Sequence, residues 1–281
     1  MTAAGEVVAS GLAFPEGPVW RDGELVFTEV EGGVVSRWTA AGGVDRLAST
    51  GGGPNGAAVG PDGVLYVTQN GGMTAAARTT AGIQRVGDDG AVAMVLTSVA
   101  GVTLEGPNDL AFGPDGRLWF TDPRGAADPS RNDRSGRLFA VDLATGEGEL
   151  VLEVGPVFPN GIAFLADPDG TLVWTESFTR RVMALVDGRP QLVIELPERH
   201  HPDGLCVGDD GRLYVASTYA HCVSVVDGGE IVDRLACGDG MVTNCCFGGT
   251  DLYVTESRRG TLWHFELDVR ASTAFAGSTA S

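Results

Sequence analysis

The 281-residue chain contains no lysine, because all nineteen of its basic residues are arginine. A chain without lysine cannot form a lysine Schiff base, and it lacks the lysine of a phosphate-binding P-loop. Acidic residues outnumber basic residues by 37 to 19, which gives a net charge of −18. This charge repels the phosphates of nucleic acids and of anionic membranes. We therefore expect neither nucleic acid nor a membrane as a partner.

Cysteine is scarce as well. The five cysteines are an odd number without CxxC spacing, so the pattern predicts buried, reduced thiols and no zinc site. The segment MTAAGEVVAS lacks the basic and apolar regions of a secretory signal, and no apolar run reaches the ~18 residues of a membrane-spanning helix. These absences predict a cytoplasmic protein.

Glycine, in contrast, is abundant, with 42 residues spread along the chain. This abundance indicates many tight turns, and the turns reveal a repeat of six copies. Each copy has a polar residue in a Pro/Gly setting, an apolar strand, a turn rich in Asp and Gly, and a second strand. We call the six polar residues the pivot residues: Glu16, Asn55, Asn108, Asn160, Asp203 and Asn244.

The spacing of the pivot residues predicts the fold. Successive pivots lie 39, 53, 52, 43 and 41 residues apart, near the ~40 to 50 residues of a four-stranded propeller blade. The first copy accommodates four strands near residues 17–21, 24–30, 34–39 and 44–48. We predict an all-β, six-bladed β-propeller of four antiparallel strands per blade, forming a single domain over residues 1–270, with a flexible tail at 271–281.

The last copy has room for only three strands, whereas Glu6–Ser10 forms an apolar segment without a partner in the first copy. We expect this N-terminal strand to complete the sixth blade. Such closure leaves no exposed sheet edge in the ring.

In a propeller the first strand of each blade lines the central channel, so the six pivot residues should converge at one end of it. Two long connections, 71–81 and 123–135, open on the same face and should form a rim or lid, because loops of this length are commonly functional. The second strands end on this face too, which makes Asp122 and the following Arg124 candidate substrate-binding residues. His200 and His201 precede Asp203, and a proton-shuttling role for them stays open.

Carboxylate and amide oxygens are the only ligands that the pivot residues offer. Such hard donors favour Ca²⁺ or Mg²⁺ over Zn²⁺. Ca²⁺ is favoured because it accepts ~6 to 8 irregularly placed oxygens, with Mg²⁺, Mn²⁺ and Zn²⁺ as alternatives. Any single Pro-Asn-Gly can be a plain turn, but six registered copies that carry Glu in one blade and Asp in another favour a site.

Five motifs carry a resemblance to a known family: EGPVW from Glu16, PNDLAF with FTDP from Pro107 to Pro123, PNGIAF from Pro159, PDGLCV from Pro202 and TNCCFGG from Thr243. With them the chain resembles the regucalcin/gluconolactonase-like lactonases, which are six-bladed propellers. The resemblance implies one divalent metal held by Glu16, Asn160 and Asp203, with Asn108 as a further ligand or a substrate contact. It also implies that Asp203 is the catalytic general base.

The resemblance implies a calcium-dependent lactonase, a hydrolase that opens a lactone or related ester by attack of activated water. Two alternatives stay open: phosphotriester hydrolysis, as in related propellers, and a non-catalytic calcium-binding propeller. Family members that open sugar lactones often have an arginine two residues before the position of Asn108. That residue is Gly106 here, so the sequence does not predict a sugar-acid lactone.

Overall fold

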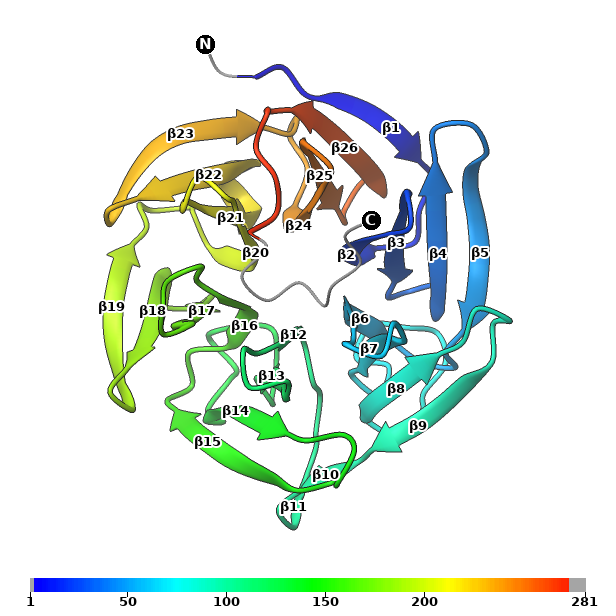
Figure 1. Cartoon of the computed structure of the whole chain (residues 1–281), viewed down its shortest axis with the longest axis vertical. Coiled ribbons are helices and arrows are strands. Elements are labelled where there is room, and N and C mark those ends of the chain that lie inside the picture. The colour runs from blue at the N-terminus through cyan, green and yellow to red at the C-terminus, as the bar shows by residue number, and fades with distance from the viewer. Residues whose placement is uncertain (1–2, 273–281) are drawn as a thin grey trace.

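The structure is a computed structural model and describes residues 3–272. Six four-stranded antiparallel sheets stand around a central axis as the blades of a propeller (Figure 1), which confirms the predicted fold. Among the described residues the only helix is the short 3₁₀ turn η1 (Thr218–Ala220). No helix within residues 3–272 is long and apolar enough to cross a membrane.

The first three blades follow one another along the chain. Blade one consists of β2 (Pro15–Arg21), β3 (Glu24–Glu29), β4 (Val34–Thr39) and β5 (Gly43–Ser49). Blade two consists of β6 (Pro54–Val59), β7 (Leu65–Gln69), β8 (Gly82–Val86) and β9 (Val92–Leu96). A small hairpin, β10 (Ser98–Val99) and β11 (Val102–Thr103), leads to blade three. Blade three consists of β12 (Leu110–Phe112), β13 (Leu118–Asp122), β14 (Gly136–Val141) and β15 (Gly148–Val154).

The last three blades repeat this order from the axis outward. Blade four consists of β16 (Pro159–Phe164), β17 (Leu172–Glu176), β18 (Arg181–Val186) and β19 (Arg189–Glu195). Blade five consists of β20 (Pro202–Val207), β21 (Leu213–Ser217), β22 (Cys222–Asp227) and β23 (Glu230–Ala236). Blade six consists of β24 (Val242–Gly248), β25 (Asp251–Glu256), β26 (Thr261–Glu266) and the N-terminal strand β1 (Glu6–Ser10).

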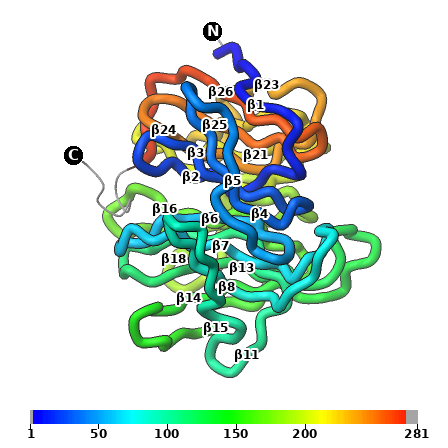
Figure 2. Tube along the Cα trace, turned by 90° about the vertical axis from the view of Figure 1, so that its right-hand side faces the viewer, coloured from blue at the N-terminus to red at the C-terminus, as the bar shows by residue number. Residues whose placement is uncertain are grey.

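Strand β1 closes the ring, as the sequence predicted. It pairs antiparallel with β26, with Glu6 opposite His264 and Ser10 opposite Thr261. The two strands run side by side in the face view and in the side view (Figures 1 and 2). At the other terminus, Ala271 forms a β-bridge with Gly208, and the Ser272 amide donates to the Val207 carbonyl over 2.9 Å. The rest of the predicted flexible tail lies outside the described residues.

The hydrophobic core lies between neighbouring blades, because the middle strands carry apolar side chains on both faces. One cluster joins Val26 and Val35 of blade one to Leu65 and Val67 of blade two. All four side chains are buried to 97% or more, so adjacent blades are held together by burial of apolar surface. The five cysteines are free thiols, three of them buried.

A β-bulge marks the start of nearly every blade. In blades one, two, four, five and six the ladder between the first two strands shifts register close to the pivot residue. In blade three, pairing begins only at Leu110, directly after Asn108 and Asp109. A bulge redirects a side chain out of the alternating pattern of a strand. This irregularity is what allows a polar residue to begin a strand that is otherwise part of the core.

Candidate functional site

Five of the six pivot residues line a single pocket at one end of the channel: Glu16, Asn55, Asn108, Asn160 and Asp203. The pocket has a volume of about 260 Å³. Both long connections contribute to its wall, as predicted, through residues such as Met73 and Pro129. A larger cavity of about 420 Å³ occupies the opposite end, where the lining is mainly apolar and no pivot residue takes part. The carboxyl and amide side chains of the pivot residues are therefore found at the smaller of these two pockets.

Threonine hydroxyls fix the backbone of the pivot residues. Thr28 Oγ1 donates to the Asn55 carbonyl over 2.6 Å, Thr121 Oγ1 to the Asn160 carbonyl over 2.7 Å, and Thr175 Oγ1 to the Asp203 carbonyl over 2.6 Å. Thr68 Oγ1 makes the same bond to the Asn108 carbonyl. In each case a second strand holds the first strand of the next blade. The threonines are fully buried, so four pivots are set by bonds across blade junctions that solvent does not reach.

The side chain of Asn160 is fixed by Ser177. The amide nitrogen of Asn160 donates to Ser177 Oγ over 3.1 Å, and Ser177 Oγ donates to the Pro202 carbonyl over 2.7 Å. This chain of bonds links a pivot in blade four to the residue before Asp203 in blade five. Two predicted metal ligands are thus coupled through one hydroxyl.

The repeat did not reveal Asp109, a third carboxyl group near the axis. Its side chain is 7% exposed and accepts a hydrogen bond from the Asn244 amide over 3.2 Å. Four of the six copies have glycine after the pivot, whereas blade three has Asp109. A Cβ on Gly56 would collide with the Asp109 carboxyl, and a Cβ on Gly204 would collide with the Asn244 side chain. These glycines leave the space that Asp109 and Asn244 occupy.

Neither Asp109 nor Asn244 is among the residues that line the pocket. Because Asn244 also accepts the Cys245 amide through Oδ1 over 2.8 Å, its polar atoms have partners within the protein. Asn244 therefore lies outside the pocket lining, although its side chain is close enough to Glu16 to favour the ionised form of that carboxyl group. The replacement of a repeated glycine by Asp in PND is the sequence signal that could have revealed Asp109.

The buried carboxyl groups strongly perturb one another. Burial, together with the Asp109 carboxyl group, raises the pKa of Glu16 to about 8. Burial raises the pKa of Asp109 to about 6. Burial and then the Glu16 and Asp109 carboxyl groups raise the pKa of Asp203 well above its usual value. No arginine lines the pocket among the described residues, so these acids lack a cationic side chain that would favour their ionised forms.

The donor set of the pocket fits a hard divalent cation in its chemistry. Glu16 and Asp203 offer carboxylate oxygens, and Asn108 and Asn160 offer amide oxygens. Within residues 3–272 no three His, Cys, Asp or Glu side chains are placed together as a metal-binding group. The predicted set contains only two such residues, so an ion there would depend on the amides and on water or substrate oxygens.

The acids at the ends of the second strands do not line the pocket, and in blades one, three and six they hold the segment that leads into the blade. Glu29 accepts the Ala13 amide over 2.7 Å, and Glu256 accepts the Met241 amide over 2.6 Å. Asp122, which is fully buried, accepts the amides of Glu105 and Gly106 over 3.2 and 3.0 Å. It thereby holds the segment that leads to Asn108.

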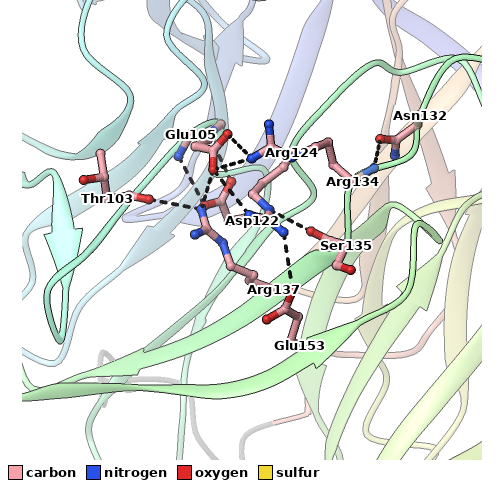
Figure 3. Close-up of polar contacts among 10 residues, drawn as sticks. Thr103, Glu105, Asp122, Arg124, Asn132, Arg134, Ser135, Arg137 and Glu153 are labelled. Atoms are coloured by element: carbon pink, nitrogen blue, oxygen red, sulfur yellow. Dashed lines mark hydrogen bonds and ion pairs between the residues drawn. The ribbon is translucent and has the colours of Figure 1, made fainter.

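Asp122 and Arg124, the other predicted substrate contacts, belong to a network of charged groups beside the pocket (Figure 3). Asp122 pairs with the buried Arg137 over 2.5 Å. Arg124 donates to the Ser135 carbonyl over 2.7 Å and pairs with Glu105 and Glu153 over 3.4 and 3.5 Å. Neither residue lines the pocket, so direct contact with a substrate stays a prediction.

The two neighbouring histidines face different environments. His201 lines the pocket, and its Nδ1 donates to the Ser177 carbonyl over 3.0 Å. His200 lies outside the lining, with Nδ1 3.1 Å from Ser224 Oγ, and burial followed by the charge of Arg234 lowers its pKa. Of the two histidines, only His201 lines the pocket.

A six-bladed propeller with oxygen ligands around one end of its channel is the class that this fold and pocket define. The sequence model of the SMP-30/Gluconolactonase/LRE-like region matches residues 14–272, and the chain belongs to this family.

Individual relatives agree with this assignment. The chain is 27% identical over 289 residues to a gluconolactonase from Zymomonas mobilis, covering 90% of this chain and 78% of that protein. It is 28% identical over 184 residues to the diisopropyl-fluorophosphatase of Loligo vulgaris, covering 59% of each protein. The structure of a gluconolactonase from Xanthomonas campestris superposes with a TM-score of 0.77 at 26% identity, covering 94% of this chain and 90% of that one.

Proposed function

We propose that the protein is a calcium-dependent hydrolase that opens a lactone or a related ester. One observation carries the proposal: two carboxyl and three amide side chains of pivot residues from five blades line one pocket that has no arginine in its wall, within the SMP-30/Gluconolactonase/LRE-like family. The gluconolactonase relatives support hydrolysis of a carboxylic ester bond. In this proposal Glu16, Asn108, Asn160 and Asp203 hold the cation.

A cation bound there would supply Lewis-acid polarisation of the substrate carbonyl. The protein's own contribution is to place the groups that hold substrate and move the proton. Asp203 accepts the proton of the attacking water, and its backbone is fixed by Thr175 at 2.6 Å. Asn160, whose amide nitrogen donates to Ser177, would offer its amide oxygen to the cation. Because burial raises the pKa of Asp203, this residue serves as a base only when a nearby positive charge favours its ionised form.

Metal removal and return test the proposal. The protein is stripped with EDTA, and Ca²⁺ is titrated back while hydrolysis of a lactone panel is followed at constant pH. We expect hydrolysis to be lost on stripping and to return saturably with Ca²⁺. Full turnover in the stripped protein would refute the proposal, and Mg²⁺, Mn²⁺ and Zn²⁺ titrations rank the alternative cations.

The Asp203→Asn variant separates catalysis from cation binding. Because Asn keeps an oxygen donor but is no longer a base, we expect calcium binding to persist and hydrolysis to fall by ~10²-fold or more. Asp210→Asn, in the turn at the far end of β20, is the matched control and should keep normal activity. Calcium binding by a parent protein that hydrolyses nothing would instead support the non-catalytic calcium-binding alternative.

Phosphotriester hydrolysis is the second candidate, and the similarity to diisopropyl-fluorophosphatase favours it. The same oxygen ligands could polarise a phosphoryl oxygen as well as a carbonyl oxygen. A phosphotriester panel assayed beside the lactone panel distinguishes the two. Turnover confined to phosphotriesters would replace the lactonase proposal.

A further inference from the structure

The wall of the pocket above the pivot residues is largely apolar. In four blades a large side chain lies just before the first strand and lines the pocket: Phe14, Phe158, His201 and Met241. Val30 and Phe178 extend this lining in blades one and four. Three of these four side chains, Phe14, Phe158 and Met241, are thus apolar, and the ring of Phe158 packs on that of Phe178 with centroids 5.0 Å apart.

Two of these phenylalanines are held in an unfavourable backbone conformation. Phe14 and Phe158 have φ angles of 63° and 56°, and each precedes a proline. Positive φ is rare for a bulky residue, and a residue before proline normally has an extended backbone. The Phe14 carbonyl accepts the Val30 amide over 3.0 Å, and the Phe158 carbonyl accepts the Ser177 amide over 3.1 Å. Such strain persists only where the surroundings impose it, commonly at ligand sites.

Met73 adds a further apolar side chain to the pocket wall, next to blade three. At Gly106 a Cβ would lie 3.8 Å from the Met73 Cε methyl group, so the thioether covers the position where blade three has no side chain. The Met73 amide is held by Asn70 Oδ1 over 3.0 Å. Met73 and Tyr219 are 38% and 52% exposed and are the pocket residues among the exposed large hydrophobic side chains of the described chain.

Several polar groups of the wall have partners within the protein. Ser177 bonds to Asn160 and Pro202, Thr218 Oγ1 donates to the His201 carbonyl over 3.2 Å, and Asn70 Oδ1 accepts two backbone amides. The neighbouring arginines, Arg124 and Arg134, pair with Glu105 outside the lining. These groups offer few free hydrogen-bonding positions to a molecule rich in hydroxyl groups.

We propose that the substrate carries a neutral apolar substituent, alkyl or aryl, on its lactone or ester group, and that this substituent contacts Phe14, Phe158, Phe178 and Met73. The proposal rests on the proposed hydrolase function and specifies its substrate class. The reacting carbonyl lies toward the pivot residues, and the substituent extends along the apolar wall. A volume of about 260 Å³ is near the lower limit of ~300 to 1,000 Å³ for ligand pockets, so the substituent is small.

A binding experiment tests the apolar wall without depending on turnover. The calcium-loaded protein is titrated by calorimetry with 2-alkylcyclopentanones, which cannot be hydrolysed and whose alkyl groups range from methyl to hexyl. Myo-inositol serves as the polyhydroxylated ring for comparison. We expect affinity to rise by up to about fourfold per methylene group until the pocket is filled. Affinity that is independent of chain length, or tighter binding of inositol, would overturn the proposal.

A turnover experiment distinguishes this proposal from the proposed function. Hydrolysis of γ-lactones with methyl to hexyl substituents is compared with hydrolysis of glucono-δ-lactone, each with Ca²⁺ present. We expect kcat/KM to rise with chain length and to exceed that for the sugar lactone. Preference for the sugar lactone would overturn the substrate class and leave the lactonase function intact. Chain-length-dependent binding with no turnover of any lactone would support the apolar wall and overturn the function.

Two methionine variants localise the effect. Met73→Ser removes a thioether from the wall, and we expect it to flatten the dependence of binding and of kcat/KM on chain length. Met94→Ser is the matched control, because Met94 is 37% exposed, close to the 38% of Met73, but lies outside the pocket on β9. Equal effects of the two substitutions would contradict the assignment.

Discussion

The hydroxyl oxygen of Ser177 lies 2.7 Å from the carbonyl oxygen of Pro202, and Ser257 makes the same contact with Pro15 over 2.7 Å. Each proline directly precedes an acidic pivot, Asp203 or Glu16. Both serines end a Thr-Glu-Ser sequence at the end of a second strand. The two carboxylates proposed to hold the cation are therefore positioned in the same way. In each case a serine of the preceding blade bonds to the proline before the acidic pivot.

Ser177→Ala should weaken calcium binding about fivefold, because Asn160 and the backbone before Asp203 both lose a hydrogen bond worth ~1 kcal/mol. Calorimetric titration of Ca²⁺ measures the change. Ser36→Ala removes the hydroxyl that donates to Glu29 over 2.6 Å, away from the pocket, and should lower stability without changing calcium affinity. Equal calcium affinities of wild type and Ser177→Ala would show that this hydroxyl has no positioning role.

Asn160→Ala should lower calcium affinity and hydrolysis far more than stability, because Asn160 is a proposed ligand. Asn244→Ala is the matched comparison, since the two asparagines are 5% and 6% exposed but Asn244 lies outside the pocket lining and is not itself a proposed ligand, although its side chain interacts with Glu16. That substitution should lower stability by ~1 to 3 kcal/mol, because the Asp109 carboxyl and the Cys245 amide lose their partner. Calcium titration and urea unfolding of both variants check this. If Asn160→Ala lowers stability without lowering calcium affinity, Pro-Asn-Gly in blade four serves only as a turn.

The metal-free protein should become less stable as the pH rises from about 4 to about 8. The carboxyl group of Glu16 releases its proton near pH 4.5 when unfolded but at about pH 8 when folded, and Asp109 changes from 3.8 to about 6. Between these values the folded chain holds protons that the unfolded chain has released, so rising pH favours unfolding. Urea unfolding in EDTA at several pH values measures the slope.

Two comparisons assign this slope to the buried acids. Asp109→Asn should reduce it, because the variant lacks one titrating group and one charge that raises the pKa of Glu16. Saturating Ca²⁺ should stabilise the protein more at pH 8 than at pH 5, because the cation competes with protons for the carboxylates. A slope that is unchanged in Asp109→Asn would place its origin elsewhere.

Asp122→Asn tests whether Asp122 supports the fold or binds substrate. Because the substitution leaves the buried Arg137 without its carboxylate, we expect a loss of ~3 to 5 kcal/mol in the free energy of unfolding. Glu105→Gln is the control within the same network (Figure 3), where Glu105 is 37% exposed and its loss should cost no more than ~1 kcal/mol. A raised KM with unchanged stability would support the predicted substrate contact.

The fold could be predicted because propeller blades repeat, so that a weak pattern such as Pro-Asn-Gly gains significance from its register with five others. The same reasoning predicted β1 as the closing strand, because Glu6–Ser10 had no partner within the first copy. The pocket followed from the pivots, five of which line it.

What the repeat could not predict are the departures from it and the contacts between blades. Asp109 escaped because it occupies a position where most copies have glycine. The acids at the ends of the second strands share a face with the pivots, but the sequence does not show that backbone amides such as that of Gly106 turn Asp122 away from the channel. The backbone of Phe14 and Phe158 was also unpredictable, because a residue before proline rarely has positive φ.

Closure of the ring by β1 and β26 has a consequence for synthesis. Strand β1 is synthesised before the other strands described, but it cannot pair until β26 has been synthesised, because Glu6 pairs with His264. Glu16 and Asp203 belong to blades one and five, and blade six lies between those blades on the closing side of the ring. A chain that ends just before Thr261 therefore contains all six pivots but lacks β26 and the closed arrangement that joins blades one and five. Activity should arise late and in one step, when the last blade forms around the first strand.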